Sequence, residues 1–96
     1  MPSTDATLRL TIGALMRLTG ERQADLAAGI GLGQTQISRK LAGSSAWSLN
    51  DVDRLSAHYG IPVPDLLAGV DRAVHCLPAR RRAPLPGAAQ LTISPE

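Results

Sequence analysis

Aromatic residues are almost missing from this sequence of 96 residues. Phe is absent, and Trp47 and Tyr59 are the only aromatic side chains. Proteins that bind single-stranded nucleic acid stack bases on several aromatic faces. The composition therefore argues against a binding platform of that kind.

Cysteine and histidine are equally scarce. The single cysteine, Cys76, cannot form a disulfide within the chain, and His58 and His75 are the only histidines. A structural zinc site would need carboxylate ligands at unfavourable spacings, so we predict no metal site. No nucleophile stands in a pattern with a base and an orienting group. We therefore predict a protein that is not an enzyme, with no catalytic residues and no cofactor.

Long hydrophobic runs are missing as well. No apolar stretch approaches the roughly 20 residues of a membrane-spanning helix, and the N-terminus lacks the pattern of a signal peptide. A chain of this length allows one small domain. We expect a soluble cytoplasmic protein that does not bind membranes.

The distribution of charge along the chain is more informative than its total. The net charge is only +2, and the basic excess lies beyond residue 69, in Arg72 and residues 80–82. Residues 26–50 contain no acidic side chain and two basic ones, Arg39 and Lys40. A polyanion can approach such a surface without repulsion.

Helical periodicity extends to about residue 74. Apolar residues recur at helical spacing, as in Leu8, Ile12 and Leu15, and glycines such as Gly20 and Gly43 end the segments. The pattern predicts an all-α fold, a compact five-helix bundle. The expected helices span about residues 5–19, 22–29, 34–42, 48–59 and 62–70. Prolines follow from residue 78 onward, which divides the chain into a helical domain, 1–76, and a proline- and arginine-rich tail, 77–96.

Residues 23–43 contain the clearest functional signal, a helix, a three-residue turn and a second helix. Gly31 permits the positive φ of a sharp turn, and apolar side chains such as Ile30 and Ile37 fit between the two helices. This layout holds the second helix on the surface with one face free.

The free face of the second helix is polar and basic. With the apolar residues toward the core, Thr35 and Arg39 point directly outward, Gln34 and Ser38 lie on one shoulder, and Gln36 lies on the other. Gln can pair with adenine, Arg can pair with guanine, and the Thr methyl group can contact thymine. The face therefore predicts base reading in the major groove of double-stranded DNA.

This segment resembles the helix-turn-helix of the phage-repressor superfamily, the Cro and xenobiotic-response-element type. The family pattern is Gln, apolar-Ala, apolar-Gly, a turn, Ile-Ser and a later Gly. Its places are filled in register by Gln23, Leu26-Ala27, Ile30-Gly31, Ile37-Ser38 and Gly43. The resemblance covers about residues 8–68 and implies a lambda-repressor-like fold. It implies that Gln23 braces a phosphate contact. It also implies that Gln34, Thr35 and Arg39 enter the groove.

Three residues depart from that family pattern. Arg22 stands where a Ser or Thr cap is usual, and Glu21 replaces a residue that is usually apolar. Lys40 stands where an apolar residue is common, and we expect it to extend sideways toward the phosphate backbone. Ser44 and Ser45, just after the second helix, either donate to phosphates or form an ordinary Gly-Ser loop.

The tail supports more than one interpretation. Residues 80–82 form either a flexible basic arm with salt-sensitive attraction to DNA or part of a passive tail. In residues 90–94, Leu91 and Ile93 alternate with polar residues in a strand-like pattern. Such a segment is able to pair with a second subunit or with another protein.

Together these observations predict a sequence-specific, double-stranded DNA-binding transcriptional regulator, most simply a repressor, associated with the nucleoid. One recognition helix buries too little surface for tight specific binding. We therefore expect a homodimer on a palindromic operator with half-site centres about 34 Å apart. The candidate dimer surfaces are the tail and the apolar residues around the fifth helix, Leu66, Leu67, Val70 and Val74. The alternative is a protein-interaction module, such as an antitoxin or adaptor, whose tail binds a protein partner.

Overall fold

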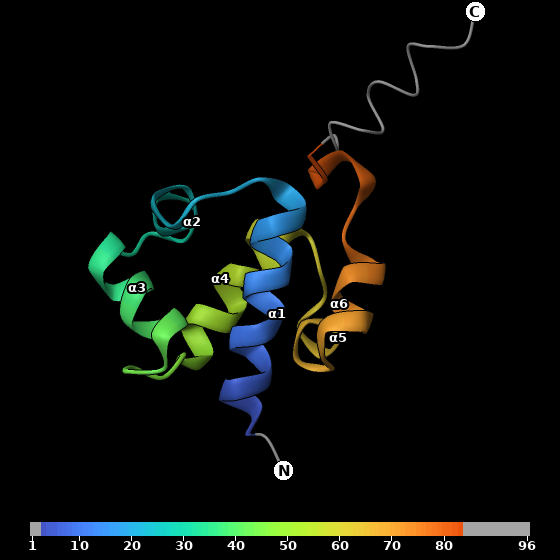
Figure 1. Cartoon of the computed structure of the whole chain (residues 1–96). Helices are drawn as coiled ribbons and strands as arrows, with labels where there is room; N and C mark the ends of the chain where they lie inside the picture. The colour runs from blue at the N-terminus through green and yellow to red at the C-terminus, as the bar shows by residue number, and fades with distance from the viewer. Residues whose placement is uncertain (1–2, 84–96) are drawn as a thin grey trace, which may run out of the picture.

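The described part of the protein, residues 3–83 of a computed structural model, consists of helices and connecting turns (Figure 1). Within these residues there are six α-helices and one short 3-10 helix, and no residue lies in a β-strand. The elements are α1 (Thr4–Thr19), α2 (Gln23–Ile30), α3 (Gln34–Ala42), α4 (Leu49–Tyr59), α5 (Val63–Leu67), α6 (Val70–Cys76) and η1 (Ala79–Arg81). The predicted all-α class is confirmed, but the number of helices is six and not five. None of the helices between residues 3 and 83 has both the length and the apolar composition of a membrane-spanning helix.

α1 lies in the centre of the bundle, with α2 and α3 on one side and α5 and α6 on the other (Figure 1). The predicted stripe of Leu8, Ile12 and Leu15 is almost completely buried. These side chains belong to one core cluster that also contains Ile37 of α3 and Leu66 of α5. The central helix therefore fixes α3 relative to the rest of the domain.

The start of α2 is better stabilised than the sequence suggests. Arg22 offers no capping oxygen, but the Asp25 carboxylate accepts a hydrogen bond from the Arg22 N–H at 2.9 Å. A negative charge in the first turn is also favoured by the helix dipole. α2 ends at Gly31, whose φ of 75° confirms the sharp turn predicted there.

The predicted fifth helix is in fact two helices, α5 and α6, so a single helix continuing through Val70 is wrong. The chain leaves the helical conformation at Gly69, where φ is 122° and ψ is 175°. Glycine adopts such angles without the steric penalty of a side chain. The break turns α6 back against α1, where its residue Ala73 is buried.

Residues 77–83, the described part of the predicted tail, lie against the helices. Leu77 is buried, and the Ala83 N–H donates to the Leu18 carbonyl at 2.8 Å. The Arg82 guanidinium donates to the Val74 carbonyl at 2.7 Å. The rest of the predicted tail, including the strand-like pattern at 90–94, lies outside the described residues.

A partly buried polar cluster around Glu21 attaches this segment to the domain. The Tyr59 O–H donates to Glu21 Oε1 at 2.7 Å, and His58 pairs with Glu21 Oε2. The Arg81 guanidinium lies 3.8 Å from the same Glu21 oxygen. Burial and the hydrogen bond to Glu21 raise the pKa of Tyr59, so the phenol stays protonated and donates. Glu21, which departs from the pattern seen in the sequence, therefore has a structural role.

Candidate nucleic-acid interface

The candidate interface is built on α3, which is held against the core from behind. Ile37 is 0% exposed and belongs to the core cluster, and Leu41 packs against that cluster one turn later. The helix ends at Gly43, where φ is 87°. The Ser44 N–H then donates to the Arg39 carbonyl at 2.9 Å. The opposite face of α3 is thereby fixed in an outward orientation.

The outward face of α3 carries the polar residues expected from the sequence. Gln34, Thr35, Ser38 and Arg39 are all exposed. Together with Gln23 of α2, they line a shallow hollow of about 350 Å³. Within residues 3–83, no carboxylate lies at ion-pair distance from Arg39. The hollow therefore combines amide and hydroxyl groups with a positive charge. Contact of these residues with DNA stays a prediction.

Gln36 has a role inside α3 that the sequence did not indicate. Its Oε1 accepts a hydrogen bond from the Gly33 N–H at 2.9 Å. Gly33 has no side chain to cap the helix, so Gln36 closes the first turn instead. Gln36 is still exposed, but its oxygen is engaged. Its oxygen therefore stabilises the start of α3, and contact of Gln36 with DNA stays a prediction.

The expectation that Lys40 extends sideways toward the phosphate backbone is wrong, because its ammonium group is held within the fold. Its side chain is only 12% exposed, and Nζ lies 2.8 Å from Asp51 Oδ2. The same ammonium group donates to the Ala46 carbonyl at 2.8 Å and lies 5.7 Å from the centre of the Trp47 ring. The reason is the carboxylate of Asp51, which is buried at the start of α4 and needs a counter-charge. Lys40 thus joins the end of α3 to α4 and is not free to reach a phosphate.

The Lys40–Asp51 pair predicts a loss of stability in acid. Burial raises the pKa of Asp51, but hydrogen bonds from Lys40 and Ser48 outweigh it and hold the pKa below the usual 3.8. Such a group stabilises the fold above its unfolded pKa and loses this effect as the pH falls through the folded value. We expect the free energy of unfolding to fall as the pH drops below about 4, the usual pKa of an aspartate in an unfolded chain.

Urea unfolding of the wild-type chain and of Asp51→Asn across this pH range measures the contribution of the pair. The wild type should lose its stability advantage over the variant as the pH falls. A difference in stability that does not change with pH would contradict this role of Asp51.

Ser44 and Ser45 lie in the loop that follows α3. The N–H groups of both residues donate to the Arg39 carbonyl, at 2.9 Å and 3.3 Å. Ser44 is exposed, whereas Ser45 is half-buried. Since the backbone N–H groups are engaged, only the hydroxyl groups remain as candidate phosphate donors.

Comparison with known families shows what kind of domain this arrangement belongs to. A family model described as the BetR domain matches residues 10–91, most of the chain. The chain belongs to the BetR domain family. This match corrects the resemblance drawn from residues 23–43, because the family is not the phage-repressor or xenobiotic-response-element type. No curated protein and no solved structure matches the chain.

This BetR domain places one more cation beside α3 than the sequence indicated. The guanidinium of Arg9, on α1, lies against Gly43, where an added Cβ would be 3.2 Å from Arg9 Cζ. One carboxylate oxygen of Asp5 pairs with Arg9, and the other accepts a hydrogen bond from the backbone N–H of Trp47 at 2.9 Å. The spacing of Asp5 and Arg9 is visible in the sequence as a helical pair. The position of Arg9 at the end of α3 follows only from the packing of α1 on α3.

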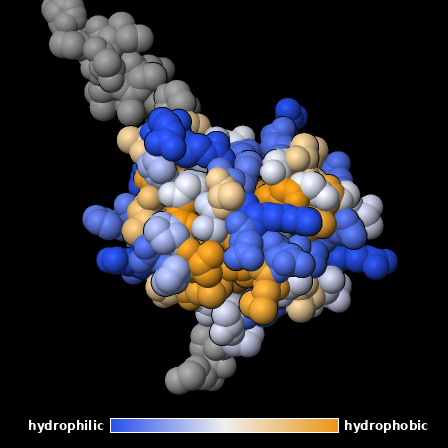
Figure 2. Space-filling view, turned by 180° about the vertical axis from the view of Figure 1, so that it is seen from behind, coloured by the Kyte–Doolittle hydropathy of each residue, from blue (hydrophilic) through white to orange (hydrophobic). Residues whose placement is uncertain are grey.

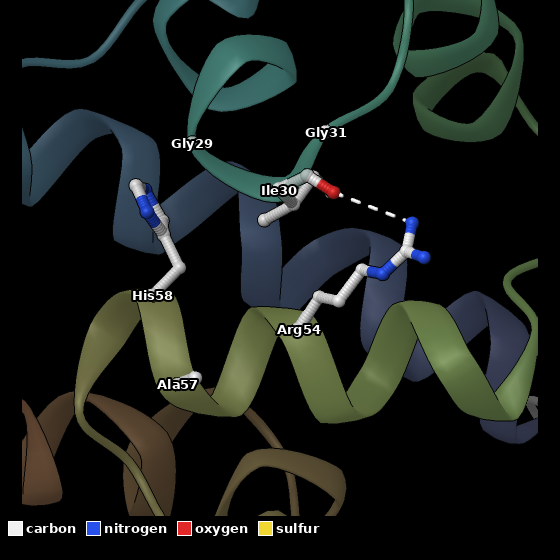
Figure 3. A pocket seen from close by; sticks show the side chains of 6 residues that line it. All are labelled: Gly29, Ile30, Gly31, Arg54, Ala57 and His58. Carbon is white, nitrogen blue, oxygen red and sulfur yellow. Dashed lines mark hydrogen bonds between the residues drawn. The ribbon is translucent and has the colours of Figure 1, made fainter.

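A second hollow of the BetR domain, of about 480 Å³, lies between the end of α2 and α4 (Figure 3). Its two polar side chains come from α4, and both are engaged by the fold. Arg54 donates to the Ile30 carbonyl at 3.4 Å, and His58 pairs with Glu21. An added Cβ on Gly29 would collide with the His58 ring, so this glycine makes room for that pair. In residues 3–83, no group of three or more His, Cys, Asp or Glu side chains is placed to hold a metal ion.

Proposed function

We propose that this BetR domain binds double-stranded DNA in a sequence-specific manner and acts as a transcriptional regulator. In this proposal α2 and α3 act as a helix-turn-helix, and α3 is the recognition helix. The observation that carries the proposal is the exposed face of Gln34, Thr35, Ser38 and Arg39 in front of the completely buried Ile37. A rigidly held face without acidic groups is suited to a polyanion.

The side chains on this face match the chemistry of base edges. A helix face that meets only water more often carries Glu and Lys. Here Gln34 offers an amide for adenine, Arg39 offers a guanidinium for guanine, and Thr35 offers a methyl group for thymine. The major groove is about 12 Å wide and admits one such helix.

In this proposal, groups at both ends of α3 contact the DNA backbone. Gln23, the first residue of α2, lines the same hollow as Arg39. At the other end, the Ser44 hydroxyl lies in the loop beside Gly43, which contacts Arg9. Contacts of this type fix the position of a protein on the duplex and do not read sequence.

We further propose that two copies of the chain bind one operator with two-fold symmetry. A single recognition helix covers too few base pairs for tight specific binding. Half-site centres about 34 Å apart would place both helices on one side of the duplex. The simplest mechanism is repression by occupying cytoplasmic DNA, through binding alone and without a chemical step.

Selection of bound duplexes from a random pool tests this proposal. We expect one enriched sequence with two-fold symmetry. We also expect its affinity to fall on the order of 100-fold between 50 mM and 200 mM salt, as for a protein that neutralises about four phosphates, two in each copy. Unselected duplex of the same length is the control. Failure to enrich any sequence would contradict the proposal.

A further inference from the structure

Leu49, the first residue of α4, is an apolar side chain with 84% of its surface exposed. It stands at the rim of an apolar groove of about 270 Å³ between the starts of α1 and α4. The buried side chains of Leu8, Trp47 and Val52 line the groove, and Leu67 of α5 lines it as well. Single exposed leucines are common on proteins, but one beside an apolar groove forms a patch of the kind that binds partners. Seen from behind, apolar side chains gather on parts of the surface between polar ones (Figure 2).

We propose that this groove binds a second copy of the same chain, and that Leu49 of each copy inserts into the groove of the other. The inference rests on the proposed function, because an operator with two-fold symmetry requires a pair of recognition helices. The groove replaces the dimer surfaces suggested by the sequence. Of the residues named for those surfaces, only Leu67 lines the groove.

The choice of a second copy follows from the shape of the surface. The protruding Leu49 and the groove lie side by side. A two-fold axis therefore brings each Leu49 to the groove of the other copy in a single contact. A segment of an unrelated protein would fill the groove but would have to supply a separate pocket for Leu49.

The charged groups near the groove do not oppose this pairing. Asp5 lines the groove, and Asp51 directly precedes the lining residue Val52. Both carboxylates are paired within their own chain, Asp5 with Arg9 and Asp51 with Lys40. Two identical surfaces of this kind can meet without strong repulsion between like charges.

The groove is also placed so that α3 stays free. None of its lining residues belongs to the hollow formed by Gln23 and the outward face of α3. Ala46 and Trp47, which line the groove, lie in the link between α3 and α4. Pairing at this link would set the distance between the two recognition helices.

Sedimentation equilibrium of the full chain without DNA tests the surface, with Leu49→Lys as the variant. The matched control is Leu10→Lys, because Leu10 is the other large exposed hydrophobic residue among residues 3–83, at 67%. We expect Leu49→Lys to raise the dimer dissociation constant on the order of 100-fold or more, since each dimer loses two buried leucines. Leu10→Lys should leave the constant unchanged. Circular dichroism of both variants verifies that they fold.

Trp47 provides a second readout, because it is the only tryptophan of the chain and lines the groove. Its fluorescence anisotropy should rise with protein concentration in the wild type and in Leu10→Lys, but not in Leu49→Lys. A wild-type chain that stays monomeric would overturn the inference.

These experiments distinguish a failure of the dimer surface from a failure of the proposed DNA-binding function. A dimer that Leu49→Lys disrupts, in a protein that selects no DNA sequence, would support the surface and reject the function. A monomer that selects a sequence would reject the surface and support DNA reading.

Discussion

Replacing Ile37 by alanine is expected to lower the free energy of unfolding by about 2–5 kcal/mol. The Ile37 side chain is 0% exposed and lies in the core cluster with residues of α1 and α4. Truncation leaves a cavity that α3 can close only by moving from its place against α1. Small domains have free energies of unfolding of about 5–15 kcal/mol. The substitution therefore removes a large part of the stability of the domain. Urea unfolding followed by circular dichroism measures the loss.

Thr35→Ala is the matched control for this experiment. It changes a residue on the exposed face of the same helix, two positions from Ile37. We expect its effect on stability to stay within about 0.5 kcal/mol. If Ile37→Ala unfolded at the same urea concentration as Thr35→Ala, Ile37 would not be what holds α3 in place.

The second large effect concerns specific DNA binding. Gln34→Ala and Thr35→Ala are each expected to cost about 1–3 kcal/mol of binding to the selected duplex while leaving the fold intact. The physical reason is that a base edge loses its partner, whereas the phosphate contacts remain. Binding to random duplex of equal length should therefore change much less. Fluorescence anisotropy titrations on both duplexes at one salt concentration measure the difference.

Arg72→Ala is the control for this comparison. Arg72 lies on α6, on the other side of α1 from α3 (Figure 1), and pairs with Asp65 at 2.8 Å. We expect it to leave the ratio of specific to random affinity unchanged. Equal losses on the two duplexes for Gln34→Ala and Thr35→Ala would instead show that these residues do not read bases.

Features that depend on neighbouring residues could be predicted from the sequence. Ser48 and Asp51 have the three-residue spacing of a capping box, and each side chain accepts a hydrogen bond from the other's backbone N–H, at 3.0 Å and 2.8 Å. The burial of Ile37 and the exposure of Thr35 follow from helical periodicity alone. For this reason the outward orientation of the polar face of α3 could be predicted from the sequence.

Features that depend on distant residues could not be predicted. Lys40 looked like a free surface cation because its partner, Asp51, belongs to the next helix. The break at Gly69 was missed because glycine is tolerated inside helices, and only its φ of 122° in the fold separates α5 from α6. The first family assignment was wrong for a related reason. Small and apolar residues are needed at a tight turn wherever two helices cross closely. More than one family contains such a crossing, so the pattern does not identify the family.

The most direct test of the account is a titration of the ¹⁵N-labelled protein with the selected duplex, followed by amide chemical shifts in NMR spectra. We predict that the largest shifts fall on Gln23 and on α3 from Gln34 to Arg39, and that random duplex moves these signals less. Shifts centred on α5 and α6, with α3 unchanged, would contradict the assignment of α3 as the surface that reads DNA.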